Sequence, residues 1–71
     1  MTVLPITTEY IKLQDLMKLA DLVSTGGEAK LHILNEEVTV NGEVCTMRGR
    51  KLRPGDTVTL AGQTLEIVSC G

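Results

Sequence analysis

The spacing of the apolar residues changes partway along this chain, and that change constrains its fold. Leu13, Leu16, Met17 and Ala20 recur at the helical period, which predicts an amphipathic helix over about residues 13–22. From residue 38 onward, apolar and polar residues alternate, as is typical of strands that bury one face. Residues 8–13 alternate in the same way and predict a short strand that leads into the helix.

A second helix is predicted to begin after the sequence Ser-Thr-Gly-Gly-Glu at residues 24–28. Thr25 and Glu28 have the spacing of a capping box, in which each side chain satisfies an otherwise free backbone N–H group. We expect this helix to extend to about residue 35. Because the connection between the helices is short, we expect them to form a helix hairpin.

Turn signals separate the strand patterns that follow. Asn41-Gly42 lies between two alternating segments, 38–40 and 43–47, and predicts a type I′ hairpin turn, since both residue types tolerate positive φ angles. Pro54-Gly55 suits a type II turn. Segments 56–60 and 64–68 then predict two strands joined by a tight turn. The sequence therefore predicts an α+β fold, with a helix hairpin packed on a small, mostly antiparallel sheet.

The length and the scarcity of aromatic residues limit what the fold can contain. With 71 residues we expect one domain, residues 1–71, with a core over about 9–68, as a monomer without room for a small-molecule active site. Trp and Phe are absent and Tyr10 is the single aromatic residue, so the core must be aliphatic. Proteins that grip single-stranded nucleic acid usually stack bases on several rings, so folded RNA is the better match.

Several functional classes lack sequence support. There is no secretory signal and no apolar run of about 20 residues, so we expect a cytoplasmic protein without a membrane partner. Cys45 and Cys70 lack metal-site spacing, and we expect two buried thiols. His32 has no acidic or thiol partners at metal spacing. Without a catalytic dyad, phosphate loop or metal cluster, we predict no enzymatic activity, no cofactor and no metal.

The strongest functional signal is residues 48–53, Arg-Gly-Arg-Lys-Leu-Arg, which we name the basic segment. It holds four of the seven basic residues and no acid, whereas the rest of the chain has three basic and nine acidic residues. Such polarity favours contact with a polyanion at one face. We expect Leu52 to point inward and the four charged side chains to contact RNA phosphates. These are Arg48, Arg50, Lys51 and Arg53.

The other candidate residues each have a structural and a functional interpretation. Lys30 is either a surface lysine or a phosphate ligand near a glycine-rich helix start, where a cation opposes the helix dipole. Lys18 has an aspartate three residues to either side, so ion pairing explains it without RNA. Lys12 is similarly ambiguous, Thr25 is first a helix cap, and Asn41 is first a turn residue.

Three blocks of sequence together resemble the alpha-L RNA-binding domain, which is found in the fourth protein of the small ribosomal subunit and in pseudouridine synthases. They are Gly26-Gly27-Glu28-Ala29-Lys30, Val40-Asn41-Gly42-Glu43, and Arg48 through Asp56. The resemblance implies binding of structured RNA, typically ribosomal RNA or a ribosomal subunit, and a role in ribosome assembly or RNA maintenance. It also adds Asn41 as an RNA contact. Family members often have two adjacent arginines where this chain has Met47-Arg48, which puts one phosphate contact in doubt.

Two other functions remain open from the sequence. Ubiquitin-like sulfur carriers also place Val-Asn-Gly-Glu before a Gly-Asp turn, but their chemistry needs a Gly-Gly terminus. This chain ends Ser69-Cys70-Gly71, and its predicted helices precede the hairpin. Alternatively, the basic segment docks on an acidic protein partner, for which the sequence offers no specific motif.

Overall fold

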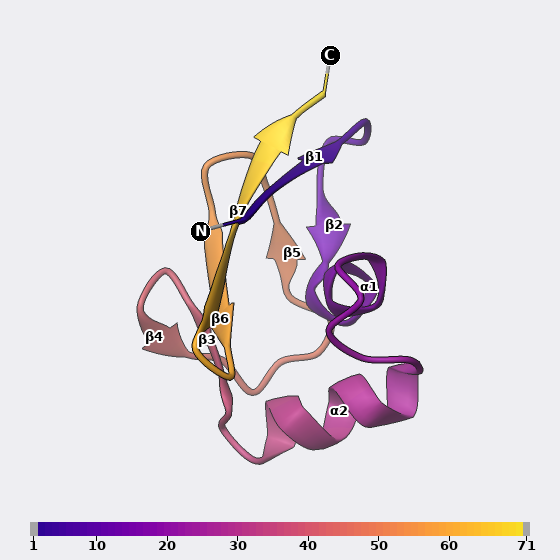
Figure 1. Ribbon diagram of the computed structural model, residues 1–71, viewed down its shortest axis with the longest axis vertical. Helices are drawn as coiled ribbons and strands as arrows, with labels where there is room; N and C mark the ends of the chain where they lie inside the picture. The colour runs from indigo at the N-terminus through magenta and orange to yellow at the C-terminus, as the bar shows by residue number, and fades with distance from the viewer. Residues whose placement is uncertain (1, 71) are drawn as a thin grey trace.

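The structure, a computed structural model, describes residues 2–70 and contains two helices and seven strands (Figure 1). The helices are α1 (Leu13–Leu19) and α2 (Gly26–Leu34). The strands are β1 (Thr2–Ile6), β2 (Ile11–Lys12), β3 (Val38–Val40), β4 (Glu43–Val44), β5 (Lys51–Leu52), β6 (Thr57–Leu60) and β7 (Gln63–Ser69). Gly71, on which the comparison with sulfur carriers depends, lies outside the described residues.

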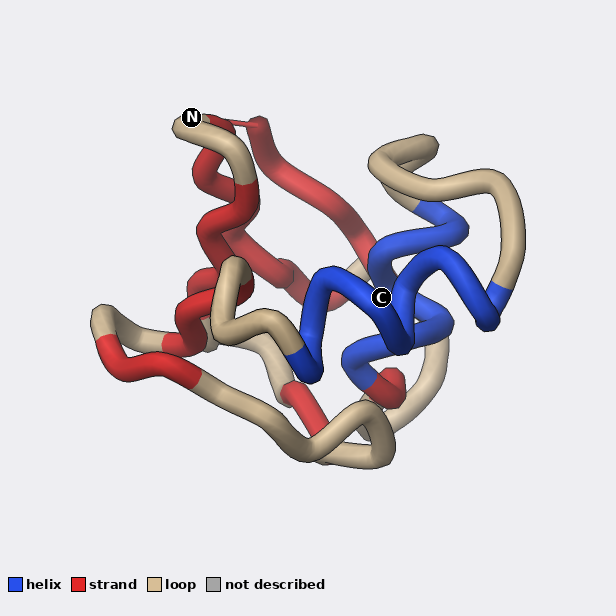
Figure 2. The backbone as a smooth tube through the Cα atoms, turned by 90° about the horizontal axis from the view of Figure 1, so that it is seen from below, coloured by secondary structure: helices blue, strands red, loops and turns tan. Residues whose placement is uncertain are grey.

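The strands form two sheets that lie mostly to one side of the helices (Figure 2). The larger sheet has the order β1-β7-β6-β3-β4, and only the β1–β7 pair is parallel. β2 and β5 make a separate antiparallel pair beside α1 (Figure 1). Asn41 and Gly42 have φ angles of 53° and 86°, as a type I′ turn requires. The predicted α+β fold with a mostly antiparallel sheet is confirmed.

The start of α2 and the end of α1 are each fixed by local hydrogen bonds. The Thr25 hydroxyl accepts a hydrogen bond from the Glu28 N–H at 3.1 Å, which is one of the two bonds of the predicted capping box. Among the described residues, the return bond from the Thr25 N–H to the Glu28 side chain is absent. α1 ends at Leu19, three residues before the predicted boundary, because Asp21 adopts a φ of 61°. The N–H groups of Asp21 and Leu22 then bond back to the carbonyls of Lys18 and Met17, which is the Schellman arrangement.

The sequence prediction missed strand β1. This strand lies at the edge of the larger sheet and pairs with β7 in the register Leu4↔Ile67. Its Pro5 cannot donate a backbone hydrogen bond, and an edge strand tolerates that loss. Because the partner of β1 is at the other end of the chain, no local pattern indicates the pairing. Ile6 extends the buried core to a position before residue 9.

The core is aliphatic, as the composition requires. It joins both helices to both sheets, and its fully buried side chains include Leu13, Leu16, Met17, Ile33, Leu52 and Ile67. The prediction of two buried thiols is half wrong. Cys45 is buried, with its Sγ 3.6 Å from the Met47 carbonyl oxygen, whereas Cys70 is exposed near the end of β7; both are free.

Candidate nucleic-acid interface

The basic segment is held against the body of the protein by strand β5. β5 pairs with β2 in the register Ile11↔Leu52 and Lys12↔Lys51. Leu52 is completely buried, as predicted, while the neighbouring Lys51 and Arg53 are exposed. Because side chains alternate along a strand, anchoring Leu52 in the core turns Lys51 to the opposite face.

The backbone of the basic segment also supports the start of α1. The Leu13 N–H donates to the Arg50 carbonyl at 2.9 Å, and the Gln14 N–H donates to the Arg48 carbonyl at 3.1 Å. These bonds satisfy two of the N–H groups that a helix leaves free at its first turn, where Lys12 provides no side-chain cap. The segment is therefore fixed by its backbone and by Leu52, and its charged side chains are not needed to hold it in place.

A cluster of uncompensated positive charge results. Arg48, Arg50, Lys51 and Arg53 are all exposed, and within residues 2–70 none of them forms an ion pair. Lys12 adds a fifth charge, since it lies directly opposite Lys51 across the antiparallel pair. Like charges in that position repel each other unless an anion lies between them.

Tyr10 lies against the cluster of positive side chains, a position that the sequence did not predict. The Lys51 Nζ lies 4.9 Å from the centroid of the Tyr10 ring, which is a cation–π geometry. The ring is partly exposed. In the sequence, only the position of Tyr10 two residues before Lys12 indicates that it could lie near the basic residues. The contact with Lys51 itself depends on the pairing of β2 with β5.

Asn41 connects two turns beside the basic segment. Its Oδ1 accepts from the Thr57 N–H at 2.9 Å, and its Nδ2 donates to Asp56 Oδ1 at 3.2 Å. The other carboxylate oxygen of Asp56 accepts from the Arg53 N–H at 2.8 Å. The Asn41 amide is therefore committed to positioning the end of the basic segment.

Replacing Asn41 separates its two structural contributions. Asn41→Gly keeps the positive φ angle but removes the bonds to Thr57 and Asp56, and Asn41→Ala also introduces backbone strain. We expect losses in the free energy of unfolding of about 1 kcal/mol for Asn41→Gly and about 2 kcal/mol for Asn41→Ala, measured by urea denaturation. Equal stability of both variants and the parent would contradict this role.

The remaining predicted residues lie on the helices. Lys18 is on α1, and its Nζ lies 3.6 Å from Asp15 Oδ1 in an exposed ion pair. This is the ion pairing that explains Lys18 without RNA. Lys30 is exposed on α2, which packs against α1, and Thr25 is the exposed N-cap residue just before α2. Within the described part of the chain, no hydrogen bond or ion pair joins Lys30 to the basic segment. The structure thus brings together Lys12 and the basic segment, and leaves Lys18, Thr25 and Lys30 on separate elements.

Residues 2–70 meet neither the requirements of a metal site nor those of a membrane-spanning helix. Residues 2–70 contain no group of three or more His, Cys, Asp or Glu side chains placed to hold a metal ion. Within the same range, neither helix has the length and apolar character needed to cross a membrane.

Comparison with known proteins identifies the relatives of this chain. The chain is 47% identical over 57 residues to the "Probable ribosome maturation protein RlbA" of Bacillus subtilis (strain 168), covering 80% of each protein. It is 35% identical over 60 residues to the "Putative RNA-binding protein YbcJ" of Escherichia coli (strain K12), covering 84% of this chain and 86% of YbcJ.

Structure comparison and family comparison agree with these relatives. The solution structure of Escherichia coli YbcJ, described as revealing an alfaL motif involved in RNA binding, superimposes with a TM-score of 0.68 at 33% identity. The match covers 94% of this chain and 84% of YbcJ. The family model of the S4 domain matches residues 4–68. This chain therefore belongs to the S4 domain family.

Proposed function

We propose that this protein is a non-catalytic RNA-binding protein that contacts structured RNA through the basic segment and Lys12. The observation that carries the proposal is the cluster of five exposed cations on β2, on β5 and on the residues just before and after β5, whose side chains form no ion pair within residues 2–70. The backbone of the segment is ordered in advance by Leu52 and two backbone hydrogen bonds, so little backbone freedom is lost on binding. The S4 family match and the RNA-binding names of its relatives support the same function.

The other predicted residues enter the proposal with different roles. Lys30 offers a further phosphate contact, because it is exposed and forms no ion pair in the described part of the chain. Lys18 must leave Asp15 to bind RNA, so its contribution is smaller. The Thr25 hydroxyl accepts from the Glu28 N–H and can still donate its own hydrogen to a phosphate oxygen. Asn41 acts mainly by fixing the turn next to Arg53.

We further propose that the RNA partner is ribosomal RNA or a ribosomal subunit in the cytoplasm, and that the protein serves ribosome assembly. The support is the name of the Bacillus subtilis relative, a ribosome maturation protein. A chain of 71 residues with few aromatic side chains also suits recognition of RNA shape and phosphates better than extended stacking on single strands.

Crosslinking in cells tests both levels of this proposal. The protein is crosslinked to RNA in its own cells, purified under denaturing conditions, and the attached RNA is sequenced. We expect enrichment at a discrete site in ribosomal RNA. Enrichment on transfer RNA would retain RNA binding and contradict the ribosomal role, whereas background levels of RNA would contradict RNA binding itself.

A further inference from the structure

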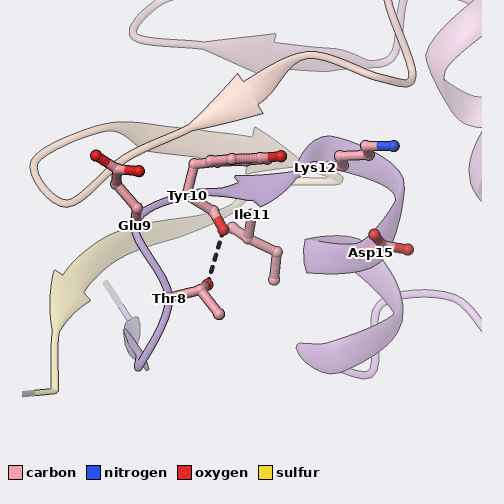
Figure 3. A pocket seen from close by; sticks show the side chains of 6 residues that line it. All are labelled: Thr8, Glu9, Tyr10, Ile11, Lys12 and Asp15. Atoms are coloured by element: carbon pink, nitrogen blue, oxygen red, sulfur yellow. Dashed lines mark hydrogen bonds between the residues drawn. The ribbon is translucent and has the colours of Figure 1, made fainter.

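A hollow of about 530 Å³ opens beside β2, at the edge of the cation cluster (Figure 3). Its volume lies within the range of about 300–1,000 Å³ that is usual for small-ligand sites. The Thr8 hydroxyl donates to the Tyr10 carbonyl at 2.7 Å and fixes the approach to the strand. The lining residues are Thr8, Glu9, Tyr10, Ile11, Lys12 and Asp15.

The lining combines three kinds of chemistry within one site. Tyr10 and Ile11 provide apolar surface, and the ring of Tyr10 is only partly buried. Glu9 and Asp15 provide carboxylate oxygens, which accept hydrogen bonds and cannot donate them when ionised. Lys12 provides a cation, and Lys51 adds a second one over the Tyr10 ring. A ligand that matches this set has a flat aromatic part, N–H donors and a negative charge.

We propose that this hollow binds one unpaired nucleotide of the RNA, with its base packed against Tyr10 and its phosphate held by Lys12 and Lys51. A nucleobase has the flat face and the N–H donors, and its phosphate has the charge. The inference rests on the proposed RNA-binding function and adds a recognition element to it. Phosphate contacts alone position a protein on RNA, whereas a pocket for one base distinguishes RNA with an unpaired nucleotide from a continuous duplex.

The position of Tyr10 favours one nucleotide rather than a bound single strand. Proteins that follow single strands present several rings in succession, and this chain has one. That ring lies next to the Lys12↔Lys51 pair, so a duplex backbone on the basic segment would place a neighbouring extruded nucleotide within reach of the hollow. The single aromatic side chain of the protein is thus located where one stacking contact is useful.

The test uses a matched pair of RNA hairpins with the same stem and a four-nucleotide loop. One loop carries adenine bases, and the other has the same backbone with abasic sites, so both present the same phosphates. We expect the protein to bind the base-bearing hairpin about tenfold more tightly, the usual size of one base–aromatic stack. Tyr10→Leu should abolish the preference for the base-bearing hairpin, and Tyr10→Phe should retain it.

Fluorine NMR gives an independent measurement that does not require a variant. Because Tyr10 is the only tyrosine, labelling with 3-fluorotyrosine gives one signal. It should shift on addition of the base-bearing hairpin and remain nearly unchanged with the abasic one. Equal affinity for both hairpins with an unmoved signal would overturn the nucleotide site and leave the proposed RNA binding standing. Failure of both hairpins to bind would overturn both.

Discussion

Replacing Arg48, Arg50, Lys51 and Arg53 with glutamine should reduce the salt dependence of RNA binding by about 3.6 units of log–log slope. Each phosphate contact on a duplex contributes about 0.9 units through release of counterions. The affinity at low salt should fall on the order of a hundredfold, because four contacts are lost together. The measurement is the dissociation constant for a structured RNA across a series of salt concentrations.

The controls for this prediction come from the same chain. The four replaced side chains are exposed, and their backbone bonds to α1 and Asp56 are independent of side-chain charge, so the variant should remain folded by circular dichroism. Lys18→Gln removes one charge that is already paired with Asp15 and should change the slope by less than one unit. A folded four-residue variant with an unchanged slope would show that RNA contacts a different face.

The parts of the fold that the sequence predicts correctly are those set by local chemistry. The cap at Thr25 and the turn at Asn41-Gly42 depend on residues a few positions apart, and both form as expected. The alternation of residues 56–60 and 64–68 likewise predicts β6 and β7 to within one residue at each end, because each strand has one face against the core. These signals need no knowledge of the rest of the chain.

The parts that the sequence does not predict depend on distant partners or on unusual backbone choices. β1 exists because β7 offers a free edge, and the paired residues are 63 positions apart in the sequence. α1 ends early because Asp21 accepts a left-handed conformation that glycine usually occupies, so the common signal for a helix end was missing. The exposure of Cys70 follows from its place beyond β7, which composition does not reveal.

In the candidate site too, the sequence predicts the features that are local and misses those that depend on distant residues. Charge density identified the basic segment, since four basic residues in six positions are visible in the sequence itself. The opposition of Lys12 and Lys51, and the contact of Lys51 with Tyr10, arise only when β2 pairs with β5. The role of Asn41 in holding Asp56 and Thr57 also depends on a contact across many residues.

The second large effect concerns the anchor of the basic segment. Leu52 is completely buried and is the one apolar side chain among residues 48–53. Leu52→Ala should lower the free energy of unfolding by about 2–5 kcal/mol, because it removes buried apolar surface and leaves a cavity. A domain of this size has a total stability of only about 4–10 kcal/mol, so the variant should be close to unfolding at 37 °C. Urea denaturation followed by circular dichroism measures the change.

Leu31→Ala provides the matched control, since it makes the same chemical change at a side chain that is 63% exposed on α2. We expect its effect to be within about 0.5 kcal/mol of the parent. If Leu52→Ala proved as mild as Leu31→Ala, the basic segment would not be fixed by burial of Leu52, and the preordered interface would lose its main support. If Leu52→Ala is strongly destabilising, the residue that positions the RNA-binding cations also stabilises the core, so the interface and the fold cannot be weakened separately at this position.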